Sequence, residues 1–155
     1  MRAKEGIIDR LNTLLAHELM ATDQYVVHSE MAANWGYGRI AEKFRQLSID
    51  EMKDAQNFIK HIFYLESVPK MLRTGPVQVA GDVPRLLELN LQREQEVVEA
   101  LVEAIAHCAQ VGDFNTRGML EEMIRDEETH VDWFETQLET IRQIGAENYL
   151  TQQLG

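Results

Sequence analysis

Residues 66–81 read ESVPKMLRTGPVQVAG, and this stretch decides the topology of the chain. It contains prolines and glycines and lacks the helical apolar repeat that continues on both sides of it, and its VQV triplet is too short for a normal strand. About sixteen extended residues span roughly 50 Å, more than the roughly 40 Å length of a helix of about 27 residues. The stretch can therefore join opposite ends of a helical bundle.

Four long helices are predicted around this crossover, two before it and two after it. Glycines and prolines place the first pair at about residues 5–35 and 39–65. Asp82 and Asp113 are suitable N-caps for the second pair, which should end near Gly112 and by Gly145. The tail, AENYLTQQLG, is expected to add a short helical piece.

The links within each pair are only a few residues long, which forces antiparallel hairpins. A four-helix bundle with one long crossover is the ferritin-like arrangement. We therefore expect an all-α fold: a ferritin-like four-helix bundle with one long crossover and a short C-terminal helix. A chain of 155 residues with 45% hydrophobic content is expected to form one domain, residues 1–155.

Composition narrows the functional classes. The one cysteine, Cys108, excludes an intramolecular disulfide and a cysteine zinc site, so we expect a reducing compartment. No stretch is typical of a signal peptide or a membrane span, and a cytoplasmic location is expected. A formal charge of −11 disfavours nucleic acid as a partner and is compatible with metal cations.

Each predicted helix has an apolar seam with steps of three and four residues, and each seam is interrupted by an acid near its middle. The four seams are Leu11, Leu15, Glu18, Thr22, Tyr25 and Ser29; Ile40, Phe44, Leu47, Glu51, Asp54 and Phe58; Leu87, Leu91, Glu94, Val98, Leu101 and Ile105; and Leu120, Met123, Glu127, His130 and Phe134.

The interruptions should meet at one level of the core. A single acid on a predicted seam is more often a surface residue whose helix face was assigned wrongly. Four such errors at matching depth in four helices are improbable. Buried carboxylates are costly unless they are paired or bind metal, and the seams offer no lysine or arginine. Oxygen ligands with one imidazole suit iron or manganese, and the group is large enough for two ions bridged by carboxylates.

Two further positions have alternative interpretations. Tyr25, one heptad after Glu18, is either ordinary core or a hydroxyl that hydrogen-bonds a ligand. Glu103 and His107 form a possible i, i+4 metal pair, but neither lies on a seam, and a solvated face is favoured.

These residues resemble the di-iron ferroxidase centre of bacterioferritins, the haem-containing bacterial ferritins. Similar stretches run along the chain: LNTLLAHEL, SIDEMK, RDEETHVDWFE and the NYL of the tail. The resemblance implies iron storage in a hollow shell of twenty-four subunits, with Fe(II) oxidised by oxygen or peroxide and ferric mineral deposited inside. It also implies Glu18 and Glu94 as terminal ligands, Glu51 and Glu127 as bridging ligands, and His130 on one iron.

Met52 belongs to a second apolar stripe with Ile49, Ile59 and Phe63, which implies a partner chain. From the residues alone, Met52 would fill a dimer interface. The resemblance instead implies that it ligates haem b, with a second methionine from another subunit. Haem would then conduct electrons that release stored iron, with a small ferredoxin as donor.

The chain departs from the bacterioferritin pattern at two positions. Asp54 stands where the family usually has histidine, so a fifth carboxylate leaves two bound Fe(II) ions at about −1 by formal count, and its short side chain raises the question of reach. Gln46 replaces a histidine that some members pair with the acid at Asp50, so Asp50 is expected to be a solvated acid rather than an iron relay.

Three functions are compatible with the sequence. The first is a ferroxidase and iron store. The second is a haem-bearing structural subunit of a mixed shell, in which Asp54 makes the site slow or inactive. The third is a di-iron redox enzyme on a smaller bundle, as in rubrerythrin-like proteins, which is weakened because the chain has no cysteine pattern for a rubredoxin-type site.

Overall fold

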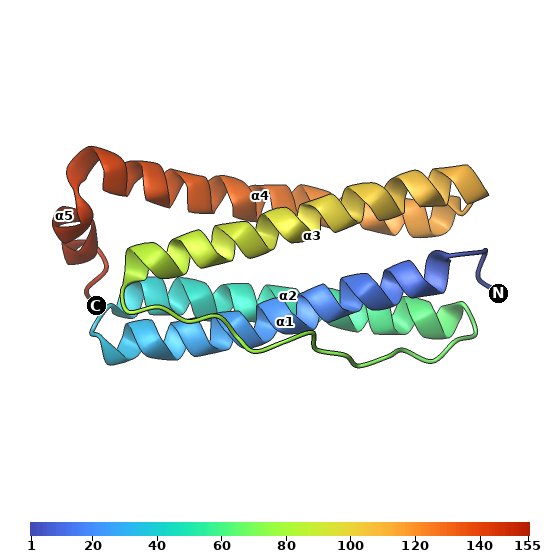
Figure 1. Ribbon diagram of the computed structural model, residues 1–155, viewed down its shortest axis with the longest axis horizontal. Coiled ribbons are helices and arrows are strands. Elements are labelled where there is room, and N and C mark those ends of the chain that lie inside the picture. The colour runs from blue at the N-terminus through green and yellow to red at the C-terminus, as the bar shows by residue number, and fades with distance from the viewer.

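The computed structural model describes all residues, 1–155, and its regular secondary structure consists only of helices. Figure 1 shows two antiparallel hairpins stacked as two layers, with a short last helix at one end. The all-α prediction, with four long helices and a short C-terminal one, is confirmed. The helices are α1 (Ile7–Asn34), α2 (Gly38–Tyr64), α3 (Val83–Val111), α4 (Phe114–Ile144) and α5 (Ala146–Thr151).

The two predicted N-caps of the second hairpin are present. The Asp82 carboxylate accepts a hydrogen bond from the backbone N–H of Arg85 at 2.8 Å, and Asp113 accepts one from Thr116 at 3.0 Å. Between them, α3 ends at Gly112, whose φ of 77° is the left-handed conformation that glycine adopts without strain. These caps fix where the second hairpin begins and turns.

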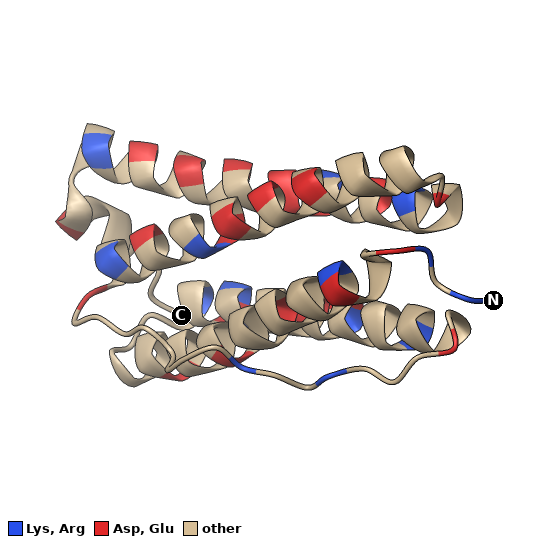
Figure 2. Ribbon diagram, turned by 45° about the vertical axis from the view of Figure 1, so that its right-hand side comes forward, with Lys and Arg blue, Asp and Glu red and all other residues tan.

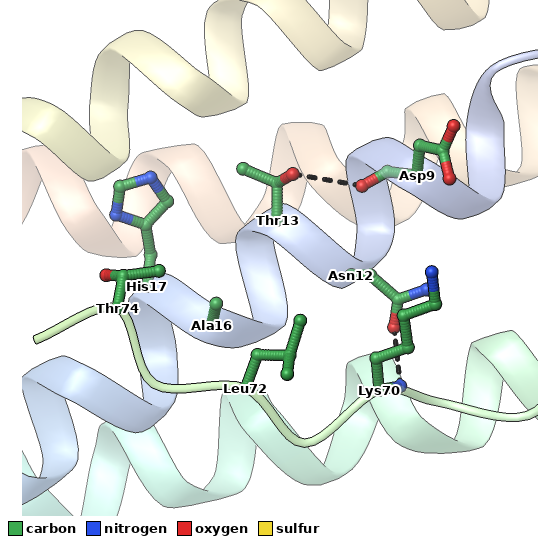
Figure 3. A pocket seen from close by; sticks show the side chains of 8 residues that line it. All are labelled: Asp9, Asn12, Thr13, Ala16, His17, Lys70, Leu72 and Thr74. Atoms are coloured by element: carbon green, nitrogen blue, oxygen red, sulfur yellow. Dashed lines mark hydrogen bonds between the residues drawn. The ribbon is translucent and has the colours of Figure 1, made fainter.

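The crossover runs along the outside of the first hairpin for its whole length (Figure 1). It has no strand at residues 77–79, as expected. The backbone N–H of Lys70 donates to Asn12 Oδ1 at 2.8 Å (Figure 3), and Arg73 forms an ion pair with Asp23 at 2.6 Å. Polar contacts to α1 therefore hold the crossover against the bundle.

The apolar core forms two clusters, one toward each end of the bundle, rather than one continuous column. One contains Leu11, Leu15, Phe58, Leu101 and Leu120. The other contains Tyr25, Ile40, Phe44, Leu87 and Phe134. In α2, α3 and α4 the seam acid lies between residues of the two clusters, and in α1 Glu18 lies at their boundary, beside Leu19 of the first cluster. A polar layer therefore divides the core.

The predicted seam of α3 needs one correction. Beyond Glu94 the buried residues are Val97, Leu101, Ala104 and Cys108, whereas the predicted Val98 and Ile105 are only partly buried. The predicted Leu87, Glu94 and Leu101 are buried and keep their seven-residue spacing. The seam position after Glu94 and after Leu101 lies three residues further on instead of four, so Val97 and Ala104 are buried.

A buried polar network, which the sequence analysis did not anticipate, joins α1, α3 and the crossover. Gln24 donates to Asn90 Oδ1 at 2.8 Å, and the Asn90 amide donates to His28 Nδ1 at 2.9 Å. His28 Nε2–H then donates to the backbone carbonyl of Gln78 at 2.7 Å. The network therefore fixes the last part of the crossover to the core and requires a neutral His28.

The C-terminal tail is hydrogen-bonded to the first turn of α2. Tyr149 of α5 is buried and donates to Gln137 of α4 at 2.7 Å. The Gln153 carbonyl accepts the backbone N–H of Arg39 at 3.0 Å, which matters because α2 has no side-chain N-cap. None of the helices has an apolar stretch sufficient to cross a membrane.

We predict that His28 makes folding stability depend on pH. Burial lowers the pKa of His28, so the unfolded chain binds a proton more readily than the folded one. The contribution of His28 to the free energy of unfolding should therefore be fully present above the ordinary histidine pKa of about 6.5. It should decrease as the pH falls below that value. Urea unfolding of the metal-free protein at pH 7.5 and pH 5.5 should show a larger loss for the native chain than for His28→Gln. Parallel losses would contradict this, and His107→Gln, at the surface, is the control.

Candidate metal centre

Six side chains from the four long helices converge in the polar layer between the two apolar clusters. They form two groups of four, and within each group the potential ligand atoms all lie within 4.8 Å of one another. One group is Glu51, Glu94, Glu127 and His130, and the other is Glu18, Glu51, Asp54 and Glu127. Glu51 and Glu127 belong to both groups.

Helical spacing explains the convergence. Glu51 and Asp54 on α2, like Glu127 and His130 on α4, are three residues apart and therefore lie on one helix face. The four glutamates are at most 1% exposed, whereas the side chain of His130 is 13% exposed and Asp54 is partly buried. The centre is therefore closed on the α1 and α3 side, and its two partly exposed members come from α2 and α4.

His130 faces three of the carboxylates. Its Nδ1 lies 3.2 Å from Glu51 Oε1, 3.4 Å from Glu127 Oε2 and 3.7 Å from Glu94 Oε2. The Tyr25 hydroxyl donates a short hydrogen bond to Glu94 Oε1. Tyr25 is thus both a buried core residue and a hydrogen-bond donor to a potential ligand, so the two interpretations of this residue are compatible.

Most of the centre's polar atoms have no partner. Eight buried side-chain nitrogen or oxygen atoms lack a hydrogen bond, and seven of them belong to this centre. They are Glu18 Oε2, Glu94 Oε2, both carboxylate oxygens of Glu51 and of Glu127, and His130 Nδ1. Unpartnered buried acceptors are costly, and bound cations satisfy such oxygens and nitrogen together.

No lysine or arginine neutralises these acids. Figure 2 shows acidic residues along both hairpins, with many on α3 and α4. Every ion pair that involves an arginine joins it to an acid outside the centre. The His130 imidazole is the one basic side chain within ion-pair distance of the glutamates.

Burial favours the protonated form of several of these acids when no cation is bound. Burial and the charges of Glu51 and Glu127 raise the pKa of Glu18 well above its usual range. Burial raises the pKa of Asp54 to about 7. Burial alone would lower the pKa of His130, but its contacts with Glu127, Glu51 and Glu94 raise it to about 12. Divalent cations would displace these protons, as they do at other carboxylate and histidine sites.

Asp54 reaches the centre despite its short side chain. One of its oxygens lies within 4.8 Å of ligand atoms of Glu18, Glu51 and Glu127. Asp54 is therefore close enough to these glutamates to share a cation with them, and its role as a metal ligand stays a prediction.

The other acid and histidine candidates do not join the centre. Glu103 forms an ion pair with Arg10 at 2.8 Å, and His107 contacts the backbone carbonyl of Glu5 at 2.7 Å. These contacts favour the surface interpretation of the pair. Asp50 accepts a hydrogen bond at 3.1 Å from the side chain of Gln46, one turn earlier on the same helix. This contact lies outside the metal centre.

Met52 lies on the outer face of α2, away from the acids, with 41% of its surface exposed. It lines a shallow groove of about 410 Å³ between α1 and α2. The groove is completed by Thr22, Val26, Ser48, Ile49, Lys53 and Gln56. Val26 and Phe63 are also exposed, at 49% and 57%, so this face carries apolar side chains without a partner in the chain.

A second cavity of about 410 Å³ lies between α1 and the crossover (Figure 3). Its walls carry groups of both charge signs, Asp9 and Lys70 among them, and hydroxyls of Thr13 and Thr74. None of its lining residues belongs to either ligand group. This cavity is a feature of the crossover rather than of the metal centre.

Comparison with known proteins agrees with this fold. Residues 8–144 match the family Ferritin, described as a ferritin-like domain. The chain is 39% identical to a bacterial ferritin of Pseudomonas aeruginosa over 155 residues, which cover 99% of this chain and 100% of the relative. It is 35% identical to a bacterioferritin of Brucella melitensis biotype 1 over 149 residues, 96% of this chain and 92% of the relative.

The fold and the matched family define a ferritin-like protein. Within that class, the similarity over nearly the full length of both chains shows that this protein belongs to the bacterioferritin family.

We predict that Glu127→Gln will stabilise the metal-free protein. The substitution replaces a buried, unpartnered carboxyl with a neutral amide of similar shape, and the gain should be roughly 1–3 kcal/mol. The same change should reduce the rise in thermal midpoint when Mn(II) or Zn(II) is added, because a ligand shared by both groups is lost. Thermal unfolding with and without cation measures both effects. Glu122→Gln, at an exposed position of α4, should change neither, and a destabilised metal-free Glu127→Gln would contradict the account.

Proposed function

We propose that this chain binds two Fe(II) ions, oxidises them with oxygen or peroxide, and stores the ferric product, as a ferroxidase of the cytoplasm. The single observation that carries this proposal is the pair of ligand groups that share Glu51 and Glu127. Two groups that share two carboxylates suit two cations held close together and bridged. Bound iron supplies the one-electron chemistry, and the residues of the chain supply the geometry.

Each residue has a distinct proposed part. Glu51 and Glu127 would bridge the ions, while Glu18 and Asp54 on one side and Glu94 and His130 on the other would hold one ion each. The hydrogen bond from Tyr25 fixes the orientation of Glu94, which leaves Glu94 Oε2 free for metal. The partial exposure of Asp54 and His130 favours entry of iron between α2 and α4.

We further propose that Met52 binds haem b between two copies of the chain. The donor set fits: the exposed thioether lies in a largely apolar groove, and Lys53 places a positive charge beside it. The Met52 thioether would hold the haem iron and tune its potential, and bound haem would supply electron transfer to stored iron. The family resemblance adds a small ferredoxin as the electron donor, and that part rests on the resemblance alone.

The exposed apolar face of α1 and α2 also supports assembly. Val26, Met52 and Phe63 need cover, and a second copy that presents the same face would bury them symmetrically. We propose a shell of twenty-four chains, as the family resemblance implies. Light scattering of the purified protein tests this: a particle of that size supports the shell, and an isolated monomer or pair contradicts it.

Fe(II) oxidation tests the proposed activity. Adding two Fe(II) per chain to metal-free protein in aerated buffer should give a rapid phase of oxygen consumption. Glu94→Ala should slow that phase by at least about tenfold, since it removes one ligand and leaves the Tyr25 hydroxyl without its acceptor. Glu99→Ala, at an exposed position of α3, should leave it unchanged.

The same experiment distinguishes the alternative function. If the native chain bound Fe(II) but gave no rapid phase, the ferroxidase proposal would be wrong. A haem-bearing structural subunit of a mixed shell, made inactive by Asp54, would then be the better description.

Haem binding is tested at Met52. Native protein reconstituted with haem should show the absorption bands of six-coordinate haem with two methionine ligands, at one haem per two chains. The Met52→Leu protein should lack these bands, and its affinity for haem should be at least about tenfold lower, because leucine matches the size of methionine but has no sulfur. Met71→Leu, at an exposed position of the crossover, should keep them. Unchanged spectra for Met52→Leu would exclude this residue as the ligand.

A further inference from the structure

The two ligand groups of the centre differ in chemistry. Glu51, Glu94, Glu127 and His130 provide three carboxylates and one imidazole, and we name them the imidazole group. Glu18, Glu51, Asp54 and Glu127 provide carboxylates only, and we name them the oxygen group. Because one group contains an imidazole and the other contains only carboxylates, the two halves of this centre are not equivalent.

The difference in ligands implies a difference in preferred metal. Carboxylate oxygens suit Mg²⁺, Ca²⁺ and Mn²⁺, whereas imidazole suits Zn²⁺ and iron. For sites of mixed nitrogen and oxygen ligands, affinity rises from Mn²⁺ through Fe²⁺ to the later metals of the row. A nitrogen ligand in one half should therefore favour Zn²⁺ or Fe²⁺ there over Mn²⁺.

The surroundings of the two halves point the same way. In the imidazole group, Glu94 is oriented by Tyr25, and His130 Nδ1 is unpartnered and faces the carboxylates. In the oxygen group, Glu18 and the shared glutamates are fully buried with unpartnered oxygens, but Asp54 is partly exposed. His130 of the imidazole group is partly exposed as well, so solvent access does not separate the two halves, and the difference in surroundings is the hydrogen bond that Tyr25 donates to Glu94.

We propose that the imidazole group is the first and tighter cation site and selects Zn²⁺ or Fe²⁺, and that the oxygen group is a second, weaker site that accepts Mn²⁺. The protein would then form a mixed pair from a mixture of these cations, with the two metals at defined positions. The proposal rests on the proposed function, since the same residues would take iron during oxidation. It adds the order of filling and the metal selectivity of each half.

Cation titration of the metal-free native protein tests the order of filling. Calorimetry with Zn(II) should resolve two sites whose affinities differ by about tenfold or more. After one Zn(II) per chain is bound, added Mn(II) should still bind at about one per chain, measured as loss of the six-line electron paramagnetic resonance spectrum of free Mn(II). Two Zn(II) sites of equal affinity, or exclusion of Mn(II) by the first Zn(II), would overturn the proposal.

The position of each metal is tested by diffraction. Crystals of the native protein loaded with both cations should show anomalous scattering of zinc beside His130 and of manganese beside Asp54. Both metals mixed over both positions would overturn the proposal. If neither position held a cation, the proposed ferroxidase function would fail as well, whereas mixed occupancy together with rapid Fe(II) oxidation would refute the selectivity alone.

Variants at Asp54 supply the matched comparison. Asp54→His gives each half one imidazole, so the two Zn(II) affinities should come within about threefold and Mn(II) should no longer prefer the second site. Asp54→Asn keeps the size of the side chain and one oxygen, and should weaken Mn(II) binding at the second site by about tenfold or more even if Asp54→His does not fold. Asp50→Asn, on the same helix and outside the centre, should change neither. An Asp54→Asn protein with native Mn(II) affinity would overturn the proposal.

Discussion

The main constraint on this structure is that five carboxylates lie at one level inside a helical bundle, where unneutralised charges are costly. Glu18, Glu51, Glu94 and Glu127 are almost fully buried, and Asp54 joins them from α2. One imidazole cannot neutralise them, and no lysine or arginine reaches them. Without cations, protons must occupy part of the site, because isolated buried charges are too costly. Folding and metal binding are therefore linked in this protein.

The rest of the fold holds this polar layer in place. An apolar cluster lies on each side of it, so the acids cannot move along the bundle without opening packed core. The crossover, tied to α1 by Asn12 and to the buried network by His28, joins the hairpins in the orientation that brings all four acids together. Met52, the residue after Glu51, is exposed whereas Glu51 is buried, so the acids and the exposed apolar surface lie on different faces of α2.

Much of this arrangement could be predicted from the sequence because it follows from local rules. Asp82 and Asp113 cap their helices as expected, and the length of residues 66–81 fixed the topology. The convergence of Glu18, Glu51, Glu94 and Glu127 followed from the helical period. In α3 the predicted Leu101 is buried, but Val97 and Ala104 are buried in place of Val98 and Ile105, because steps of three and of four residues both stay near one helix face. The network of Gln24, His28 and Asn90 was missed because its partners are far apart in the chain, although His28 lies three residues after Tyr25 and Asn90 four before Glu94.

The central claim is that divalent cations are what make the buried acids tolerable, and crystallography tests it most directly. Crystals of the native protein soaked anaerobically in ferrous salt should show two anomalous peaks at the iron edge. One should lie among Glu51, Glu94, Glu127 and His130, and the other among Glu18, Glu51, Asp54 and Glu127. Ordered carboxylates around an empty centre in the soaked crystals, or acids turned out to solvent, would contradict the account.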